Sequence, residues 1–396
     1  VQELKKTQAL LRQFLNENTP SSKLPFKAAP HKDKQKSKQN GKPKGSNGAT
    51  KSSPKKIDRK VKAKLGKKCN KCGKKIHRTE IENNLRYVYD IIIKPEVVEV
   101  EEETYFCDCG EHCIGKHPNF PLRGMFGYNL QAFCTELKHN FSGSYKNISK
   151  FLNSVAQIDF SDVAIHNSLK GIAKKLEPSY DRIESNLREE DYAYSDETGW
   201  PVNGKRHWLW LFVTANCIFI KIDHSRGRRV LLDIFSEKYQ GTIISDCMKA
   251  YQKFAKWFQK CWVHLLRKVK HELEKNPNLK DLYEQLCKLH EEMSGFLKED
   301  PPPELRKKKK KEYEKKLGEI VNYDWCKEAQ AIVDNWFKAY KNHWLTAIEI
   351  PGITLDNNIC ERKIRGSIGW RKMLGGHKTF EGAKNYAIIE THRQTW

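Results

Sequence analysis

Positive charge is concentrated at one end of this chain, which limits where a hydrophobic core can form. Residues 1–80 contain 24 Lys and Arg against five Asp and Glu, whereas the rest of the 396-residue chain contains 49 against 44. A segment with many like charges and few apolar side chains buries too little surface to fold. We therefore expect a nearly neutral globular body and a basic N-terminal arm. Such an arm favours a polyanionic partner, above all nucleic acid.

The first 64 residues are predicted in two parts. Residues 1–17 have helical apolar spacing and form either the end of a coiled coil or a helix packed on the body. Residues 18–64 are rich in Lys, Ser, Asn, Gly and Pro, which is typical of a flexible linker. Lysines in such a linker would neutralise DNA phosphates. The longest apolar stretch, residues 208–220, is too short to cross a bilayer, so no membrane association is expected.

Two cysteine clusters predict a zinc ribbon within residues 65–118. They are Cys69 with Cys72, and Cys107 with Cys109 and Cys113. A C-x-x-C turn presents two thiolates to one tetrahedral ion, and closely paired cysteines fit a reducing compartment. One Zn²⁺ per chain is expected, with a β segment over residues 85–100 between the clusters. The first three cysteines are the predicted ligands, the fourth is Cys109 or Cys113, and the alternative is a set of free buried thiols.

Residues 119–188 are predicted to form a helical domain that binds DNA. Apolar periodicity favours helices over residues 128–141, 145–155 and 161–176. Ser161 is the expected N-cap of the third helix, and the short link before it has helix-turn-helix spacing. Lys170 and Lys174 of that helix are candidate DNA contacts. The alternative is a helical layer with a structural role only.

From residue 189 the pattern becomes α/β. Strands are predicted over residues 192–196, 208–215, 217–223 and 241–246, and helices over residues 227–235, 249–257 and 264–274. A helical insertion is expected at about residues 275–346. Its basic run, residues 306–311, is either a solvated helix face or a patch that contacts the DNA backbone. After it, residues 357–364 read as a helix and residues 366–376 as a basic, Gly-rich loop.

Three acidic residues suggest a metal centre: Asp196, Asp246 and Glu361. Two predicted strands end in the aspartates, and a later helix carries the glutamate. A ribonuclease-H-like fold places such carboxylates together at one edge of a mixed sheet. Their hard oxygen ligands suit Mg²⁺ or Mn²⁺, and two ions roughly 3.5–4 Å apart support phosphodiester cleavage. Spacing alone also allows each carboxylate to cap a helix or form a surface ion pair.

Five segments of this sequence resemble the transposases of insertion-sequence family sixty-six. They are SDETGWPVNGKRHWLWLFV (195–213), SRGRRVLLDIFSEKYQGTIISDCMKAY (225–251), CWVHLLRKVK (261–270), LDNNICERKIR (355–365) and WRKMLGGHKTFEGA (370–383). They occur in the family's order over residues 190–396, and the zinc ribbon and helical region also match its order of parts. The second cysteine cluster is irregular for the family, and Cys360 stands where a small residue such as Ala is usual.

The resemblance implies a DDE DNA transposase with Asp196, Asp246 and Glu361 as the catalytic triad that holds two Mg²⁺ or Mn²⁺ ions. The implied fold at residues 189–396 is a ribonuclease-H-like core with the helical insertion. Its implied partners are the terminal inverted repeats of the element, target DNA, and a second copy of the chain in a dimer or larger synaptic assembly. Accessory proteins encoded by the element are a further partner class that the resemblance allows. The implied setting is the cytoplasm of a prokaryote, close to the nucleoid.

Two alternatives to the transposase remain open at this stage. One is a non-catalytic DNA-binding protein derived from such a transposase, although all three acidic residues are present. The other is a ribonuclease-H-like nuclease without strand transfer.

Residues near the triad carry further expectations. Glu197 adjoins Asp196 on the opposite strand face and is predicted to stabilise the turn. Cys261 and His264 are predicted to orient the catalytic core, with a zinc-binding pair as the alternative. Trp200 is the predicted stacking partner for a DNA base, whereas Trp208 and Trp210 are predicted to be core residues. The predicted phosphate contacts are Arg362, Lys363, Arg365, Arg371 and Lys372.

Overall fold

The computed structural model describes residues 56–63, 67–68, 71–75, 86–89, 91, 93–246, 248–251, 255, 257–338, 340 and 343–396. The described residues fall into two units, one within residues 98–396 and the other within residues 26–97. The expectations for residues 1–17 and for most of the basic linker lie outside the described residues. None of the described helices is long and apolar enough to span a membrane.

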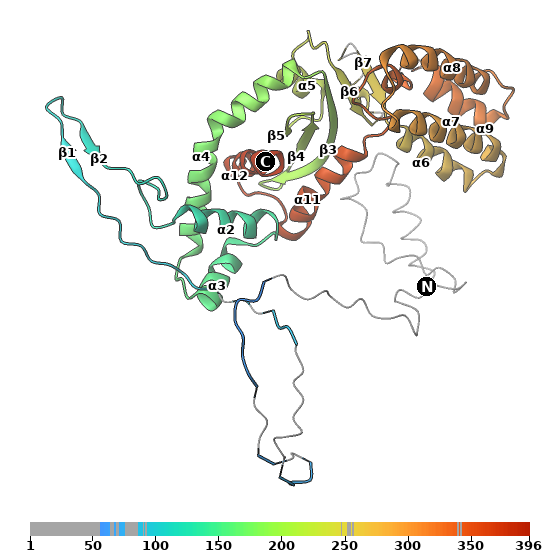
Figure 1. The fold of residues 1–396 in the computed structure, drawn as a ribbon. Coiled ribbons are helices and arrows are strands. Elements are labelled where there is room, and N and C mark those ends of the chain that lie inside the picture. Colours follow the sequence, from blue (N-terminus) through green and yellow to red (C-terminus); the bar gives the residue numbers. More distant parts are fainter. Residues whose placement is uncertain are drawn as a thin grey trace. The chain divides into compact units, whose positions relative to one another are not determined.

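A five-stranded mixed sheet forms the centre of the larger unit (Figure 1). Its strands are β3 (Tyr192–Val202), β4 (Lys205–Val213), β5 (Ile218–Asp223), β6 (Thr242–Ser245) and β7 (Trp257–Lys260), in the order β5-β4-β3-β6-β7. The first three form an antiparallel meander, while β6 pairs parallel with β3 and β7 pairs parallel with β6. The α/β class expected from the sequence is confirmed.

Both faces of the sheet are buried because strand side chains alternate between two apolar clusters. Along β4, Leu209 and Leu211 belong to one cluster, whereas Trp210 and Phe212 belong to the other. Helices supply the rest of each cluster, so the sheet is the middle layer between two helical layers. Trp208 is buried with the second cluster, as the sequence predicted for a core residue.

Among the described residues, three α-helices precede the sheet: α2 (Tyr128–His139), α3 (Tyr145–Ala156) and α4 (Asp162–Asn186). The predicted N-cap is confirmed, because the Ser161 side chain accepts a hydrogen bond from the backbone N–H of Ala164 at 3.1 Å. The third helix extends ten residues beyond its predicted end at residue 176. Its buried residues, which include Ala173 and Tyr180, continue the apolar stripe that holds it against the sheet.

The remaining helices follow or interrupt the strands. They are α5 (Arg228–Phe235), α6 (Trp262–Leu273), α7 (Lys280–Lys298), α8 (Pro303–Val321), α9 (Lys327–Val333), α10 (Thr346–Glu349), α11 (Asn358–Leu374) and α12 (Phe380–Thr395). Helices α7 to α10 occupy the stretch between α6 and α11 where the sequence predicted a helical insertion. At the head of the basic run, Arg306 is 2% exposed and donates to the backbone oxygen of Pro301 at 2.8 Å. The first residue of the run therefore anchors α8, in contrast to its exposed neighbours Lys307 and Lys308.

Two predicted elements were wrong and one strand was predicted too short, each because tertiary pairing or packing outweighs local propensity. β3 continues past Asp196 to Val202, since it pairs with β4 as far as a turn at Asn203 and Gly204. Within the predicted helix at residues 249–257, residues 249–251 form a short 3₁₀ turn and Trp257 begins β7, which pairs with β6; residues 252–254 and 256 lie outside the described residues. The predicted loop at residues 366–376 is mostly helical.

The segment at residues 366–374 is helical because one face of it is buried in the core. Ile364, Ser367 and Trp370 are all buried along one face of α11, at helical spacing. The helix ends at Leu374 with Gly375 as its C-cap residue, and Gly376 follows with a φ of +100°. A Cβ atom at Gly376 would lie 2.3 Å from the backbone oxygen of Pro201, so only glycine allows the chain to pass this close to β3.

The expected β segment at residues 85–100 is also wrong for its described residues, none of which is in a strand. A two-stranded hairpin follows instead, with β1 (Thr104–Phe106) antiparallel to β2 (His112–Ile114). The ring of Phe106 stacks on that of His112, with centroids 4.2 Å apart. The second cysteine cluster thus lies at the turn and second strand of this hairpin.

Candidate active site

Two neighbouring parallel strands carry Asp196 and Asp246 to the same level of the sheet. β3 pairs with β6 so that residues 192–194 lie opposite residues 242–244. The two aspartates continue this register two positions beyond the last pair. Asp246 directly follows β6, and its Oδ1 accepts a hydrogen bond from the backbone N–H of Met248 at 2.9 Å. Asp196 lies inside β3, because that strand continues to pair with β4.

Glu361 reaches the same region from the first turn of α11, which packs against β3 and β4. The Asn357 side-chain amide donates to the backbone oxygen of Ser195 at 2.8 Å. The thiol of Cys360 donates to the backbone oxygen of Leu211 at 3.5 Å. These contacts fix the start of α11 beside the first aspartate, and the helix dipole favours a carboxylate in this turn.

The acidic groups around Asp196 repel one another. Asp196 is partly buried, and burial raises the pKa of its carboxyl well above the usual range. The negative charges of Glu197, Asp246 and Glu361 raise that pKa further. A cation placed among the acidic groups would relieve this repulsion, and carboxylate oxygens are the ligands that hard divalent cations prefer. The residues present therefore fit a divalent metal ion in both charge and chemistry.

Glu197 forms a buried polar network on the other face of β3. Its Oε1 accepts hydrogen bonds from the Arg226 guanidinium at 2.8 and 3.0 Å, and its Oε2 accepts one from the Tyr251 hydroxyl at 2.8 Å. The same hydroxyl lies 2.9 Å from Ser195 Oγ. Burial and the negative charge of Asp246 raise the pKa of Glu197 to about 7, against the opposing effect of Arg226. This network agrees with a stabilising role for Glu197 and ties Tyr251 to β3.

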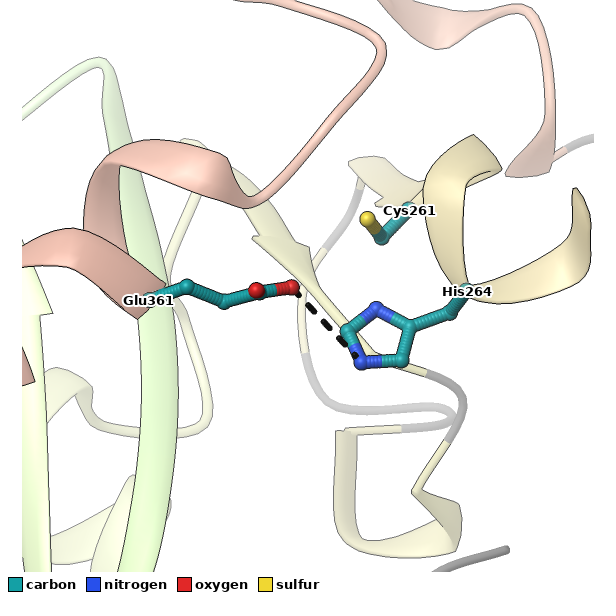
Figure 2. A group of neighbouring side chains, drawn as sticks. All are labelled: Cys261, His264 and Glu361. Carbon is teal, nitrogen blue, oxygen red and sulfur yellow. Dashed lines mark ion pairs between the residues drawn. The ribbon is translucent and has the colours of Figure 1, made fainter. Parts of the chain in front are cut away.

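Helix α6 places further side chains beside Glu361 (Figure 2). Ligand atoms of Cys261, His264 and Glu361 lie within 4.8 Å of one another, and this is the only such group of three within the described part of the chain. The His264 Nε2 atom is 3.8 Å from Glu361 Oε1. One turn along α6, Arg267 Nη1 lies 3.2 Å from the same oxygen. The glutamate is thus held by basic side chains of α6.

The thiol of Cys261 joins α6 to the start of α11. Cys261 is the N-cap residue of α6, and its Sγ accepts a hydrogen bond from the backbone N–H of Asn357 at 3.2 Å. Complete burial raises its pKa to about 12, so the group is a neutral thiol near pH 7. These contacts favour the orienting role expected for Cys261 over that of a zinc ligand.

Two predicted DNA contacts are wrong for this conformation because their side chains are buried. Trp200 is 1% exposed, and its ring stacks on those of Trp370 and His377. Arg371 is 6% exposed and donates to the Thr198 hydroxyl at 3.1 Å and to the backbone oxygen of Gly199. Neither side chain is accessible to a base or a phosphate. Both instead fix the C-terminal half of α11 against β3.

The other predicted phosphate contacts lie on the surface. Arg362, Lys363, Arg365 and Lys372 are exposed on α11, in the helix that carries Glu361. On α4, Lys170 and Lys174 are also exposed, and Lys170 forms a 2.8 Å ion pair with Glu381 of α12. Exposure allows these side chains to contact DNA but does not test it, so the contacts stay predictions.

The cysteine clusters are described in part. Cys69 lies outside the described residues, and Cys72 is exposed in a turn enclosed by a β-bridge between Lys68 and Lys75. In the hairpin, the backbone N–H and the thiol of Cys109 lower the pKa of Cys107. A lowered thiol pKa favours the thiolate that zinc requires.

The family model described as Transposase IS66 family matches residues 123–385. The chain belongs to this family. The match spans the five-stranded sheet, all three acidic residues and the helices between α6 and α11. Membership in a DDE transposase family suggests that the chain acts on DNA. No curated protein matches the chain.

Three residues next to the triad of this transposase-family chain were not singled out from the sequence: Arg226, Tyr251 and Arg267. Each lies in a segment that resembles the family, but only the three-dimensional contacts give them partners. Arg226 and Tyr251 meet at Glu197, while Arg267 meets Glu361 across 94 residues of sequence. For the contact between Arg267 and Glu361, the only local signal in the sequence was that Arg267 lies one helical turn after His264.

Proposed function

We propose that this protein is a DNA transposase that binds the ends of its element, cleaves DNA at the phosphodiester backbone and joins the freed 3′-hydroxyl to target DNA. The observation that carries the proposal is the acidic cluster on a family-matched fold. Asp196 and Asp246 share one strand register, and the raised pKa of Asp196 reflects the nearby charges of Asp246 and Glu361. The ribonuclease-H-like core that the family resemblance implies needs carboxylates on neighbouring strands of a mixed sheet.

In this proposal Asp196, Asp246 and Glu361 hold two Mg²⁺ or Mn²⁺ ions. When bound, these ions would supply Lewis-acid activation of the attacking and leaving oxygens. The chain's own residues keep the ligands in place. Asn357 fixes the start of α11 beside β3, and the Tyr251–Glu197 contact anchors the segment that follows Asp246. Among the described residues, the three carboxylates do not form a group whose ligand oxygens all lie within 4.8 Å of one another.

DNA binding is assigned to basic surfaces outside the triad. We assign backbone contacts to the exposed basic residues of α11 and α4, and non-specific affinity to the basic N-terminal segment. A zinc-bound ribbon built from the two cysteine clusters would contribute to recognition of the element ends. Because two ends must be processed together, a dimer or larger assembly is the expected active form.

The proposal is tested with Asp196→Asn, Asp246→Asn and Glu361→Gln variants on duplexes taken from the DNA that flanks the gene. Each variant should lose Mg²⁺- or Mn²⁺-dependent cleavage and joining while it retains DNA affinity at fixed salt. Cleavage without joining by the unaltered protein would indicate a nuclease. DNA binding with no metal-dependent cleavage by the unaltered protein would favour the non-catalytic DNA-binding alternative.

A matched control is Asp223→Asn. Asp223 ends β5, away from β3 and β6, and pairs with Arg229 at 2.7 Å. Its carboxylate has the same chemistry as the two triad aspartates but a different place in the sheet. The control should retain cleavage, and normal cleavage by the Asp246→Asn or Glu361→Gln variant would refute the triad.

A further inference from the structure

Arg267 is the basic side chain most directly engaged with the proposed metal ligands. Its Nη1 atom lies 3.2 Å from Glu361 Oε1 and 3.4 Å from Oε2, and its Nη2 atom lies 3.4 Å from Oε2. Both carboxylate oxygens are therefore occupied by one guanidinium. His264, on the same side of α6, approaches Oε1 to 3.8 Å.

This pairing uses the same two oxygens that a metal ligand must offer. A divalent ion held by Glu361 would neutralise the charge that attracts the guanidinium. The Arg267 side chain is 57% exposed, whereas that of Glu361 is 17% exposed. An ion pair with one solvated partner contributes little to stability and separates easily. Arg267 can therefore leave the carboxylate without unfolding α6.

A released guanidinium at this position would lie beside the acidic cluster, where the proposed function places a phosphodiester. Arginine remains charged at any physiological pH, and its planar fork matches the oxygens of a phosphate. A phosphodiester bound at the acidic cluster brings negative charge next to α6. The same side chain thus has one anionic partner without DNA and another with it.

We propose that Arg267 exchanges partners during the reaction, pairing with Glu361 in the metal-free protein and with a DNA phosphate once metal and DNA occupy the site. The inference rests on the proposed function, because it takes Glu361 as a metal ligand. It adds a phosphate-binding residue to the site. It also makes metal binding compete with an internal ion pair.

The neighbouring thiol favours this assignment over a third metal site. A thiophilic ion could in principle bind Cys261, His264 and Glu361, whose ligand atoms lie within 4.8 Å of one another. The Cys261 sulfur is already an acceptor for the Asn357 backbone N–H and is fully buried as a neutral thiol. The guanidinium of Arg267, in contrast, is solvated and already in contact with the carboxylate.

The experiment measures two quantities that should change in opposite directions. In the full-length Arg267→Ala protein without DNA, Mn²⁺ affinity measured by calorimetry should increase about three- to tenfold, because the competing cation is gone. Single-turnover cleavage of an end-containing duplex at saturating Mn²⁺ should fall at least about tenfold, because one charge-assisted contact to phosphate is lost. Arg267→Lys should restore charge but not the fork, and give intermediate values for both.

Two controls make the result decisive. Lys270→Ala removes an exposed positive charge from the same helix and should change neither quantity by more than about twofold. Unchanged or weaker Mn²⁺ affinity in the Arg267→Ala protein, with unaltered protein binding Mn²⁺ normally, overturns the exchange of partners. Equal Mn²⁺ affinity in the unaltered and Asp246→Asn proteins instead removes the proposed metal site, and the inference falls with it.

Discussion

The Tyr251→Phe substitution tests whether the network behind β3 holds the metal-binding segment in place. The Tyr251 hydroxyl is buried, donates to Glu197 Oε2 at 2.8 Å and lies 2.9 Å from Ser195 Oγ. Phenylalanine keeps the ring but leaves one oxygen of a buried carboxylate without its donor. A hydrogen bond to a charged group contributes about 1.5–3 kcal/mol, so we expect a loss of about 2 kcal/mol in the free energy of unfolding.

That loss has a measurable counterpart in melting temperature and in activity. For folded units of roughly 150–250 residues, 1 kcal/mol corresponds to about 2–4 °C, which gives a decrease of about 4–8 °C. Tyr251 lies five residues after Asp246, so the aspartate should also be less well positioned. Cleavage by the metal-loaded protein should fall about tenfold or more, since small displacements of reacting groups are costly.

Tyr180→Phe is the matched control for this substitution. The Tyr180 hydroxyl is also buried, but it donates to a neutral acceptor, the backbone oxygen of Ile220, at 2.8 Å. Its loss should cost about 1 kcal/mol and leave cleavage unchanged, because the Tyr180 hydroxyl donates to Ile220 and not to Asp196, Asp246 or Glu361. Equal decreases in melting temperature for the two variants, with full cleavage by Tyr251→Phe, would refute the reasoning.

Three further predictions follow from charge and burial. Glu197 has a folded-state pKa of about 7 against 4.5 for the free carboxyl, so its stabilising contribution is complete below pH 4.5 and is lost as the pH rises through 7. The melting temperature of the metal-free protein should therefore fall between pH 5 and pH 8, less steeply in a Glu197→Gln variant; identical slopes would contradict this. Arg306→Ala should lower the free energy of unfolding by about 3 kcal/mol in denaturant titrations, because the Arg306 side chain is buried. The same substitution at the exposed Lys307 should change that free energy by less than about 0.5 kcal/mol. Comparable effects of the two substitutions would mean that burial of Arg306 is unimportant. Purified protein should contain about one zinc per chain by elemental analysis. The zinc content should fall in a Cys109→Ser variant and be retained in a Cys113→Ser variant, since Cys109 is the hydrogen-bonding neighbour of Cys107. Zinc lost from the Cys113→Ser variant and retained in the Cys109→Ser variant would assign the fourth ligand to Cys113.

The acidic residues illustrate how far sequence patterns reach. Two carboxylates at the ends of predicted strands and one on a later helix suggested Asp196, Asp246 and Glu361, and the resemblance to the transposase family implied that they form a triad. Short runs of apolar residues also located β4, β5 and β6 closely, because strands buried on both sheet faces carry nearly continuous apolar sequence. The side chains that support the acidic cluster had no such signal. From the sequence alone, Arg226 and Arg267 look like ordinary surface charges. Their partners, Glu197 and Glu361, lie on other elements of the fold.

Burial also reversed some predictions made from residue type. Trp200 and Arg371 have the chemistry of DNA contacts, and the first lies near Asp196 in sequence. In the fold they face inward, where Trp200 stacks on Trp370 and Arg371 donates to Thr198. A local pattern does not contain this information, because the direction of a side chain depends on which element packs against it.

The sequence by itself determined the charge division of the chain, the α/β class, the order of most elements and the acidic residues that define the candidate site. These features depend on composition, on periodicity and on motifs that are contiguous in the chain. Only the tertiary structure decided that β3 runs through Asp196, that α11 continues to Leu374, and which side chains hold Glu197 and Glu361. The physical reason is that strand pairing, burial and ion pairing are interactions between residues distant in sequence, and their energies outweigh the local preferences of Gly, Pro and charged residues.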